Sequence, residues 1–210
     1  MGQIIEFPGQ TPKFGYKRVK KRAKAPENPG QLNLFPQPTA QILNFTPELS
    51  WFEQALLWDE RGNPKAAELY RKAIEEGDCI ADAYCNLGII ESQKGNTTKA
   101  FDCFTTSLKH DPRHCESHYN LGNLYFEVND FRLTQVHYEI ATEVDPTFAN
   151  VYFNLALVRA INDDPGAAVS ALAKYQELVP TEEGQKAGEL LLNLKKTLAT
   201  AKNLRHGSPR

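Results

Sequence analysis

A repeat with a period of about 34 residues constrains the fold of this chain more than any other feature of its sequence. Shifting the sequence by one period against itself aligns identical residues in three columns: Pro112, Pro146 and Pro180; Leu87, Leu121 and Leu155; and Asn86, Asn120 and Asn154. A period within the range of about 20 to 50 residues indicates units that bury their apolar faces only against neighbouring units. The chain is therefore expected to fold as a stack of similar units.

Further columns at the same period place large and small side chains at fixed positions of each unit. They are Tyr84, His118 and Tyr152; Gly88, Gly122 and Ala156; Ala66, Ala100, Thr134 and Ala168; Tyr70, Phe104, Tyr138 and Leu172; and Ala73, Ser107, Ala141 and Tyr175. Tyr84, Leu87 and Gly88 have the i, i+3, i+4 spacing of one helix face. A glycine inside a helix costs about 1 kcal/mol relative to alanine, so Gly88 and Gly122 indicate places where two helices meet closely.

These columns resemble the tetratricopeptide repeat, a helix-turn-helix of about 34 residues with a characteristic spacing of aromatic residues, Leu-Gly, alanines and a closing proline. The resemblance implies an all-α fold, a right-handed α-solenoid of four helix pairs with a C-terminal capping helix. Within a repeat domain of residues 47–201, the expected repeats are about 47–80, 81–114, 115–148 and 149–182, and the capping helix about 182–201. Trp51 and Ala66 match the repeat pattern only if repeat one is taken to begin at two positions that differ by one residue. The turn between them, at 62–64, is therefore expected to be one residue shorter than the turns of the other repeats.

The segments outside this domain differ from it in charge and proline content. Residues 1–30 contain seven basic and two acidic residues, a net charge of +5, whereas the remainder contains 17 basic and 24 acidic residues, a net charge of -7. Seven of the 13 prolines lie in the first 47 residues, where no helix or strand period persists. Residues 1–46 are therefore expected to form a flexible tail, and residues 202–210 a frayed C-terminus.

The sequence lacks the usual signals of membrane proteins, secreted proteins and enzymes. No stretch approaches the roughly 18 apolar residues of a membrane span, and the N-terminus lacks the regions of a signal peptide. The four cysteines contain no Cys-x-x-Cys pair and are expected to be reduced thiols: Cys79, Cys85, Cys103 and Cys115. Because no phosphate-binding loop, nucleophile elbow or paired carboxylate motif is found, we expect a non-enzymatic, cytoplasmic protein without a cofactor.

Two histidines have a spacing that zinc ligands can use. His114 and His118 lie four residues apart, and His110 and Cys115 are close in sequence. However, His118 occupies an aromatic packing column and Pro112 interrupts the run. No metal site is therefore expected.

In the tetratricopeptide family, the first helices of successive repeats line a concave groove, and the resemblance implies which residues do so here. The main candidates for peptide binding are Asn86, Ile89, Tyr119, Asn120, Asn123, Phe126, Phe153, Asn154 and Leu157. Other lining positions include Asp59, Asp82, Ser92, Gln93, Glu116 and Glu127. The lysines and arginines that grip a terminal carboxylate in chaperone-binding relatives are absent. Acidic and aromatic lining favours an extended segment that is apolar with basic residues.

The asparagine column resembles the ladder in the repeat arm of O-linked N-acetylglucosamine transferases, where such amides hold a peptide main chain. A carboxamide both donates and accepts a hydrogen bond, so it can pair with any peptide unit whatever the side chain. Alternatively, an asparagine before Leu-Gly caps a helix or crosses to the next repeat.

The tail contains a second candidate motif at Gln31, Leu32, Leu34 and Phe35, which resembles the pentapeptide by which bacterial replication and repair proteins dock on the sliding clamp. The alternative is that the apolar residues Leu32, Leu34 and Phe35, with Ile42 and Phe45, pack on the first repeat as part of its core. The basic run from Lys17 to Lys24 can neutralise phosphates, but it has no aromatic residue after Tyr16 for base stacking. A solvated tail, or one lying on the acidic groove of its own chain, is the preferred interpretation.

The sequence thus predicts a protein-protein interaction adaptor that binds a peptide segment in its concave groove. The alternative is a DNA replication or repair accessory factor that docks on the sliding clamp, with its basic tail near nucleic acid. A basic tail attached to an acidic body has a high effective concentration for its own groove. Residues 30–46 are expected to shield the groove until a partner competes, because their apolar side chains suit its aromatic lining.

Overall fold

The structure, a computed structural model, describes residues 16–19 and 49–180, together with residues 182, 184, 185, 187–189 and 192. Residues 49–180 contain eight α-helices and no strand. In chain order the helices are α1 (Trp51–Glu60), α2 (Ala66–Glu75), α3 (Ile80–Gln93), α4 (Thr97–His110), α5 (Cys115–Glu127), α6 (Phe131–Val144), α7 (Ala149–Ile161) and α8 (Pro165–Leu178). None of the described helices is long and apolar enough to cross a membrane.

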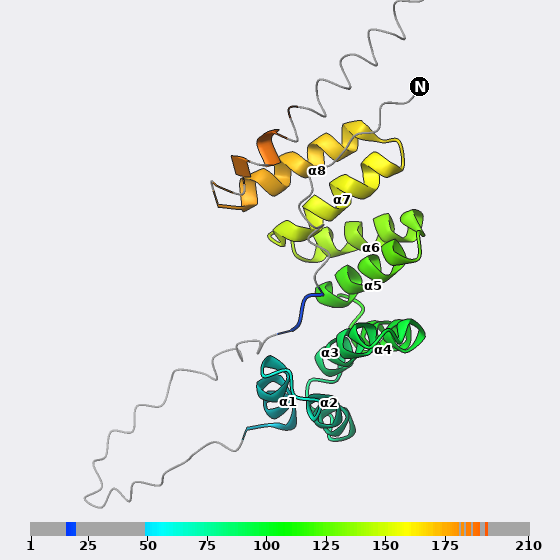
Figure 1. Cartoon of the computed structure of the whole chain (residues 1–210), viewed down its shortest axis with the longest axis vertical. Helices are drawn as coiled ribbons and strands as arrows, with labels where there is room; N and C mark the ends of the chain where they lie inside the picture. Colours follow the sequence, from blue (N-terminus) through cyan, green and yellow to red (C-terminus); the bar gives the residue numbers. More distant parts are fainter. Residues whose placement is uncertain are drawn as a thin grey trace, which may run out of the picture.

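The helices form four pairs that are stacked in sequence order (Figure 1). Helix α1 packs on α2, α3 on α4, α5 on α6 and α7 on α8, and the second helix of each pair also packs on the first helix of the next. The buried apolar residues form three clusters along the stack, as expected when each unit contacts only its neighbours. The predicted all-α solenoid of four helix pairs is confirmed.

The turns within the helix pairs explain why the two halves of repeat one match the repeat pattern one residue apart. Each turn contains one residue with positive φ: Gly62 at +64°, Gly95 at +77°, Asn129 at +62° and Asp163 at +59°. The last three lie five residues before the small side chains of α4, α6 and α8, whereas Gly62 lies only four residues before Ala66. The first turn is therefore one residue shorter, as the sequence predicts.

The end of the stack is covered by further helical residues. The described residues between 182 and 192 are helical, and Ala187 is buried in the same cluster as residues of α7 and α8. A capping helix supplies the last repeat with the neighbour that it otherwise lacks.

Candidate functional site

A short segment from the N-terminal part of the chain, Tyr16–Val19, lies against the first helices of three successive pairs. It forms neither a helix nor a strand, and it runs from α5 towards α1 (Figure 1). We call the surface that contacts it the segment site. Its polar members include Asp59 on α1, Asn86, Ser92 and Gln93 on α3, and Asn120 and Glu127 on α5.

Two asparagines hold the main chain of this segment. The N–H of Lys17 donates to Oδ1 of Asn120 at 3.0 Å, and Nδ2 of Asn120 donates to the carbonyl of Lys17 at 3.2 Å. Asn86 makes the same two bonds to Val19, at 2.9 and 3.2 Å. Both amides therefore use donor and acceptor together on one residue of the segment, and consecutive asparagines contact alternate residues, as an extended chain requires.

The two ends of the segment are held by different contacts. The side chain of Val19 is only 1% exposed and packs in an apolar cluster with Cys85, Ile89, Ala100, Phe104, Leu121 and Leu124. The ring of Tyr16 stacks on Phe104, and its hydroxyl accepts a bond from Ser92 and donates one to Glu127 at 3.0 Å. Burial raises the pKa of Tyr16 to about 12, so the hydroxyl keeps the proton that it donates.

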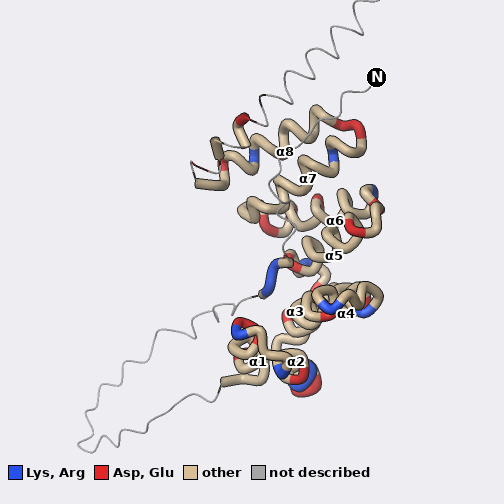
Figure 2. Tube along the Cα trace, viewed as in Figure 1, with Lys and Arg blue, Asp and Glu red and all other residues tan. Residues whose placement is uncertain are grey.

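The basic side chains of Lys17 and Arg18, which lie between Tyr16 and Val19, contact different parts of the segment site. Nε of Arg18 forms an ion pair with Oδ2 of Asp59 at 2.7 Å, and the same carboxylate accepts a bond from the hydroxyl of Tyr70 at 3.1 Å. Burial raises the pKa of Asp59, while Arg18 and Tyr70 act in the opposite direction. Nζ of Lys17 lies 3.5 Å from the centre of the Phe148 ring. Figure 2 shows this basic segment beside acidic positions of α1 and α5.

The other residues expected to line the groove differ in what they contact. Ile89 contributes to the cluster around Val19, and Tyr119 lines a cleft of about 550 Å³ beside Tyr16 and Lys17. Asn154 is fully buried, and its Nδ2 donates to the hydroxyls of Tyr119 and Tyr138 rather than to the described segment. The remaining candidates pack within the repeats or are half-buried: Asn123 accepts from Tyr138, Phe126 packs on Phe131, Phe153 packs on Tyr175, and Leu157 is half-buried.

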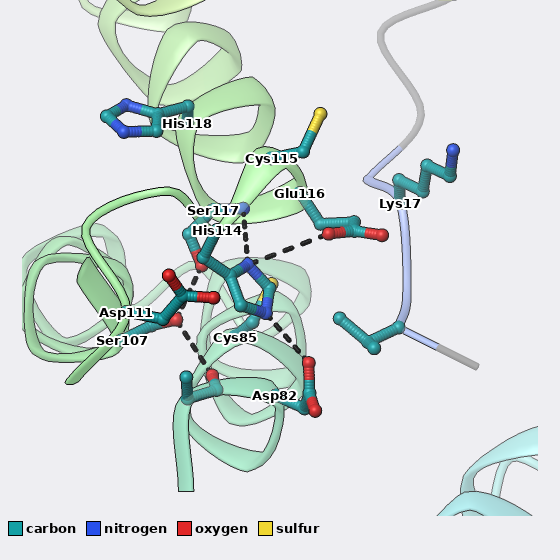
Figure 3. Close-up of polar contacts among 12 residues, drawn as sticks. Lys17, Asp82, Cys85, Ser107, Asp111, His114, Cys115, Glu116, Ser117 and His118 are labelled. Carbon is teal, nitrogen blue, oxygen red and sulfur yellow. Dashed lines mark hydrogen bonds and ion pairs between the residues drawn. The ribbon is translucent and has the colours of Figure 1, made fainter. Parts of the chain in front are cut away.

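Beneath the segment, a buried polar network joins α3, α4 and α5 (Figure 3). Nδ1 of His114 accepts from the N–H of Ser117, and Nε2 of His114 lies 2.9 Å from Oδ1 of Asp82. Ser117 donates to the hydroxyl of Ser107, which donates to the carbonyl of Ala81. His114, Ser107 and Ser117 are all fully buried. This network fixes the positions of two neighbouring repeats and thereby of Asn86 and Asn120.

The histidines that the sequence singles out do not assemble a metal site. His118 points away from His114 (Figure 3), and its Nδ1 lies 3.0 Å from Nδ1 of His137. Its Nε2 lies 3.1 Å from the carbonyl of Pro112 and must donate there, so Nδ1 of His118 accepts a hydrogen bond from His137. Among the described residues, no group of three or more His, Cys, Asp or Glu side chains is placed to hold a metal ion.

We expect this histidine pair to make stability depend on pH. Burial lowers the pKa of His118 and lowers that of His137 to about 4, from an ordinary value of 6.5. Between these values the unfolded chain binds more protons than the folded chain, so this pair lowers the stability as the pH falls from about 6.5 to 4, by up to about 3 kcal/mol for His137. Urea unfolding across this range measures the loss.

The matched variant for this prediction is His137→Phe. A phenyl ring can stack on Tyr125 as His137 does but does not titrate. Its unfolding free energy should therefore change less with pH than that of the unaltered chain. Parallel pH profiles of the two chains would contradict the assignment.

Sequence reasoning found some parts of the segment site and not others. Asp59, Ser92 and Glu127 lie at lining positions that the resemblance implied, and the structure brings them together on one segment. Tyr70 and Val19 were not expected to take part, because one belongs to a packing column and the other is a lone apolar residue in a basic run. Gln31, Leu32, Leu34 and Phe35, and the whole of residues 30–46, lie outside the described residues.

The fold and the site together define a helical-repeat protein in which residues 16–19 of the same chain lie against three repeats. The family model described as tetratricopeptide repeat matches residues 81–114, which include α3 and α4. No curated protein sequence matches the chain. The chain thus has a tetratricopeptide-repeat fold.

Similar solved structures support this fold. MamA 41-end from Desulfovibrio magneticus RS-1 is 17% identical, with a TM-score of 0.55 over 71% of this chain and 94% of that chain. Another MamA crystal structure is 16% identical, with a TM-score of 0.54 over 76% of this chain and 95% of that chain. The first TPR of Spaghetti (RPAP3), bound to the HSP90 peptide SRMEEVD, is 20% identical, with a TM-score of 0.51 over 57% of this chain and 93% of that chain.

Proposed function

We propose that this protein is a non-enzymatic, cytoplasmic adaptor that binds an extended segment of another protein in the segment site. Its own residues 16–19 occupy the site until such a partner competes for it. The observation that carries the proposal is the pairing of Asn86 and Asn120 with both main-chain groups of Val19 and Lys17. These bonds do not depend on side chains, so they are available to any extended chain in the same register.

The charges of the site support a basic partner. Asp59 forms an ion pair with Arg18, and Glu127 accepts a hydrogen bond from the hydroxyl of Tyr16. The Spaghetti (RPAP3) structure holds a peptide with two glutamates and a terminal aspartate, which is the opposite charge pattern. A shared fold can therefore serve a different class of segment here.

The ladder is tested by removing one amide that contacts the segment and one that does not. The probe is a labelled peptide with the sequence of residues 14–21, titrated into the full chain carrying Val19→Asp, a change chosen to release the attached segment. Asn120→Ala should weaken the probe about tenfold, because two part-buried hydrogen bonds to Lys17 are lost. Asn154→Ala, the matched control one repeat further on, should change the affinity by less than about twofold.

Both variants need a check of folding by circular dichroism, since both amides are buried. Equal losses of affinity in two folded variants would remove the ladder from the proposal. Absence of any binding to the Val19→Asp chain would reject the proposed function itself.

The alternative function, docking on a sliding clamp, is supported by the sequence Gln31-Leu32-Asn33-Leu34-Phe35. A peptide spanning Pro29 to Pro36 should bind a purified bacterial clamp with a Kd of roughly micromolar size, as a short segment that loses conformational freedom on binding. Phe35→Ala should abolish this binding, because the aromatic side chain is the expected anchor. Failure of the unaltered peptide to bind at high micromolar concentration would end this alternative.

A further inference from the structure

Resting on the proposed function, we infer that the site selects partner segments with the pattern aromatic residue, any residue, arginine, β-branched aliphatic residue, and that Asp59 determines the requirement for arginine. The partner is a different protein with such an extended segment. The pattern follows from the three side chains that Tyr16, Arg18 and Val19 place in separate surroundings.

The surroundings of Asp59 favour a positively charged partner. Its side chain is only 6% exposed, and its described partners are the hydroxyl of Tyr70 and the guanidinium of Arg18. A buried carboxylate is costly unless a charged partner compensates it. A segment without a cation at this position leaves Asp59 with one neutral donor, so binding of that segment carries the cost of an unpaired charge.

The surroundings of Asp59 favour arginine over lysine. While Nε of Arg18 contacts Asp59, its terminal Nη2 lies 3.4 Å from Oε1 of Gln93 on α3. One guanidinium thus joins repeats one and two through nitrogens at different positions of a planar group. An ammonium has a single nitrogen and cannot reach both oxygens in the same way.

The other two positions of the pattern fix the register of the segment. The side chain of Val19 is buried among apolar side chains, and burying a charged or amide side chain among them would be costly. At the opposite end, the hydroxyl of Tyr16 fits between Ser92 and Glu127. Lys17, by contrast, lies at the edge of the 550 Å³ cleft, and its position tolerates different side chains.

The experiment compares two peptide changes that remove the same charge. The labelled 14–21 peptide and its Arg18→Gln, Arg18→Lys and Lys17→Gln versions are titrated into the full chain carrying Val19→Asp. We expect Arg18→Gln to weaken binding about 30-fold, as for loss of a partner from a buried charge pair. Arg18→Lys should weaken it about fivefold, and Lys17→Gln about threefold.

The same series on chains that also carry Asp59→Asn or Glu60→Gln assigns the effect to one carboxylate. Asp59→Asn should reduce the Arg18→Gln effect to about twofold, whereas Glu60→Gln, which neutralises an exposed neighbour, should leave it near 30-fold. Equal effects of Arg18→Gln and Lys17→Gln, or equal effects of the two protein changes, would overturn the inference in favour of general charge attraction and leave the proposed function standing.

A second copy of the chain is the other possible source of this segment. Sedimentation of the unaltered protein distinguishes it, because exchange of segments between copies gives oligomers that Arg18→Gln in the chain dissociates. A monomer at all concentrations supports a different protein as the partner. Such oligomers would overturn that assignment.

Discussion

Replacing Val19 with aspartate should raise the apparent affinity of the full chain for a competing peptide by about 10- to 100-fold. Residues 20–50 connect the attached segment to α1, and such a covalent connection gives an effective concentration of roughly millimolar size. A free peptide of the same sequence must then reach similar concentrations to compete. Burying a carboxylate among the apolar side chains around Val19 costs several kcal/mol, so the altered segment leaves the site and the peptide binds with its intrinsic affinity.

Fluorescence anisotropy of the labelled 14–21 peptide measures this change. Val136→Asp is the matched control, because Val136 is 43% exposed on α6 and the same charge there should leave the apparent affinity unaltered. If the Val19→Asp chain binds the peptide no better than the Val136→Asp chain, the attached segment does not restrict access to the site.

The fold was predictable because its main determinants are periodic. Gly88 and Gly122 lie one repeat apart, and so do the rings of Phe104 and Tyr138 that pack against them. A repeated pair of this kind specifies the same helix contact in each unit, so the pattern can be recognised in the sequence alone. The shorter first turn was predictable for the same reason, because it displaces the pattern of the second helix by one residue relative to that of the first.

The segment site was predictable only in part because its ligand is not periodic. Asn86 and Asn120 stand in a column, and the chemistry of a carboxamide indicates main-chain binding. Nothing in the local sequence distinguishes Val19 from the more numerous apolar residues of 30–46, which were expected to shield the groove. The register depends on Asp59, Tyr70 and an apolar cluster drawn from several repeats, and these meet only in the folded stack.

Replacing Gly122 with alanine should destabilise the protein by about 2 kcal/mol through overpacking, although alanine is the better helix former. A Cβ at this position would lie 2.6 Å from Cδ1 and 3.2 Å from Cζ of Tyr138. The ring of Tyr138 is fully buried, and its hydroxyl donates to Asn123 at 2.7 Å, so it cannot move away without losing contacts. Overpacking against a ring held this tightly should cost about 3 kcal/mol, the upper end of the usual range, and the gain of about 1 kcal/mol in helix propensity then leaves a net loss of about 2 kcal/mol.

Thermal unfolding tests this prediction against Gly166→Ala in α8. A Cβ at Gly166 would meet only Oδ1 of Asp164, at 3.7 Å, so this control should be neutral or slightly stabilising. A loss of about 2 kcal/mol at Gly122 should lower the Tm by roughly 4–8 °C for a chain of this size. Equal Tm values for the two variants would mean that α5 and α6 can separate without cost. Since α5 carries Asn120 and Glu127, the segment site would then rest on a deformable repeat rather than on a rigid one.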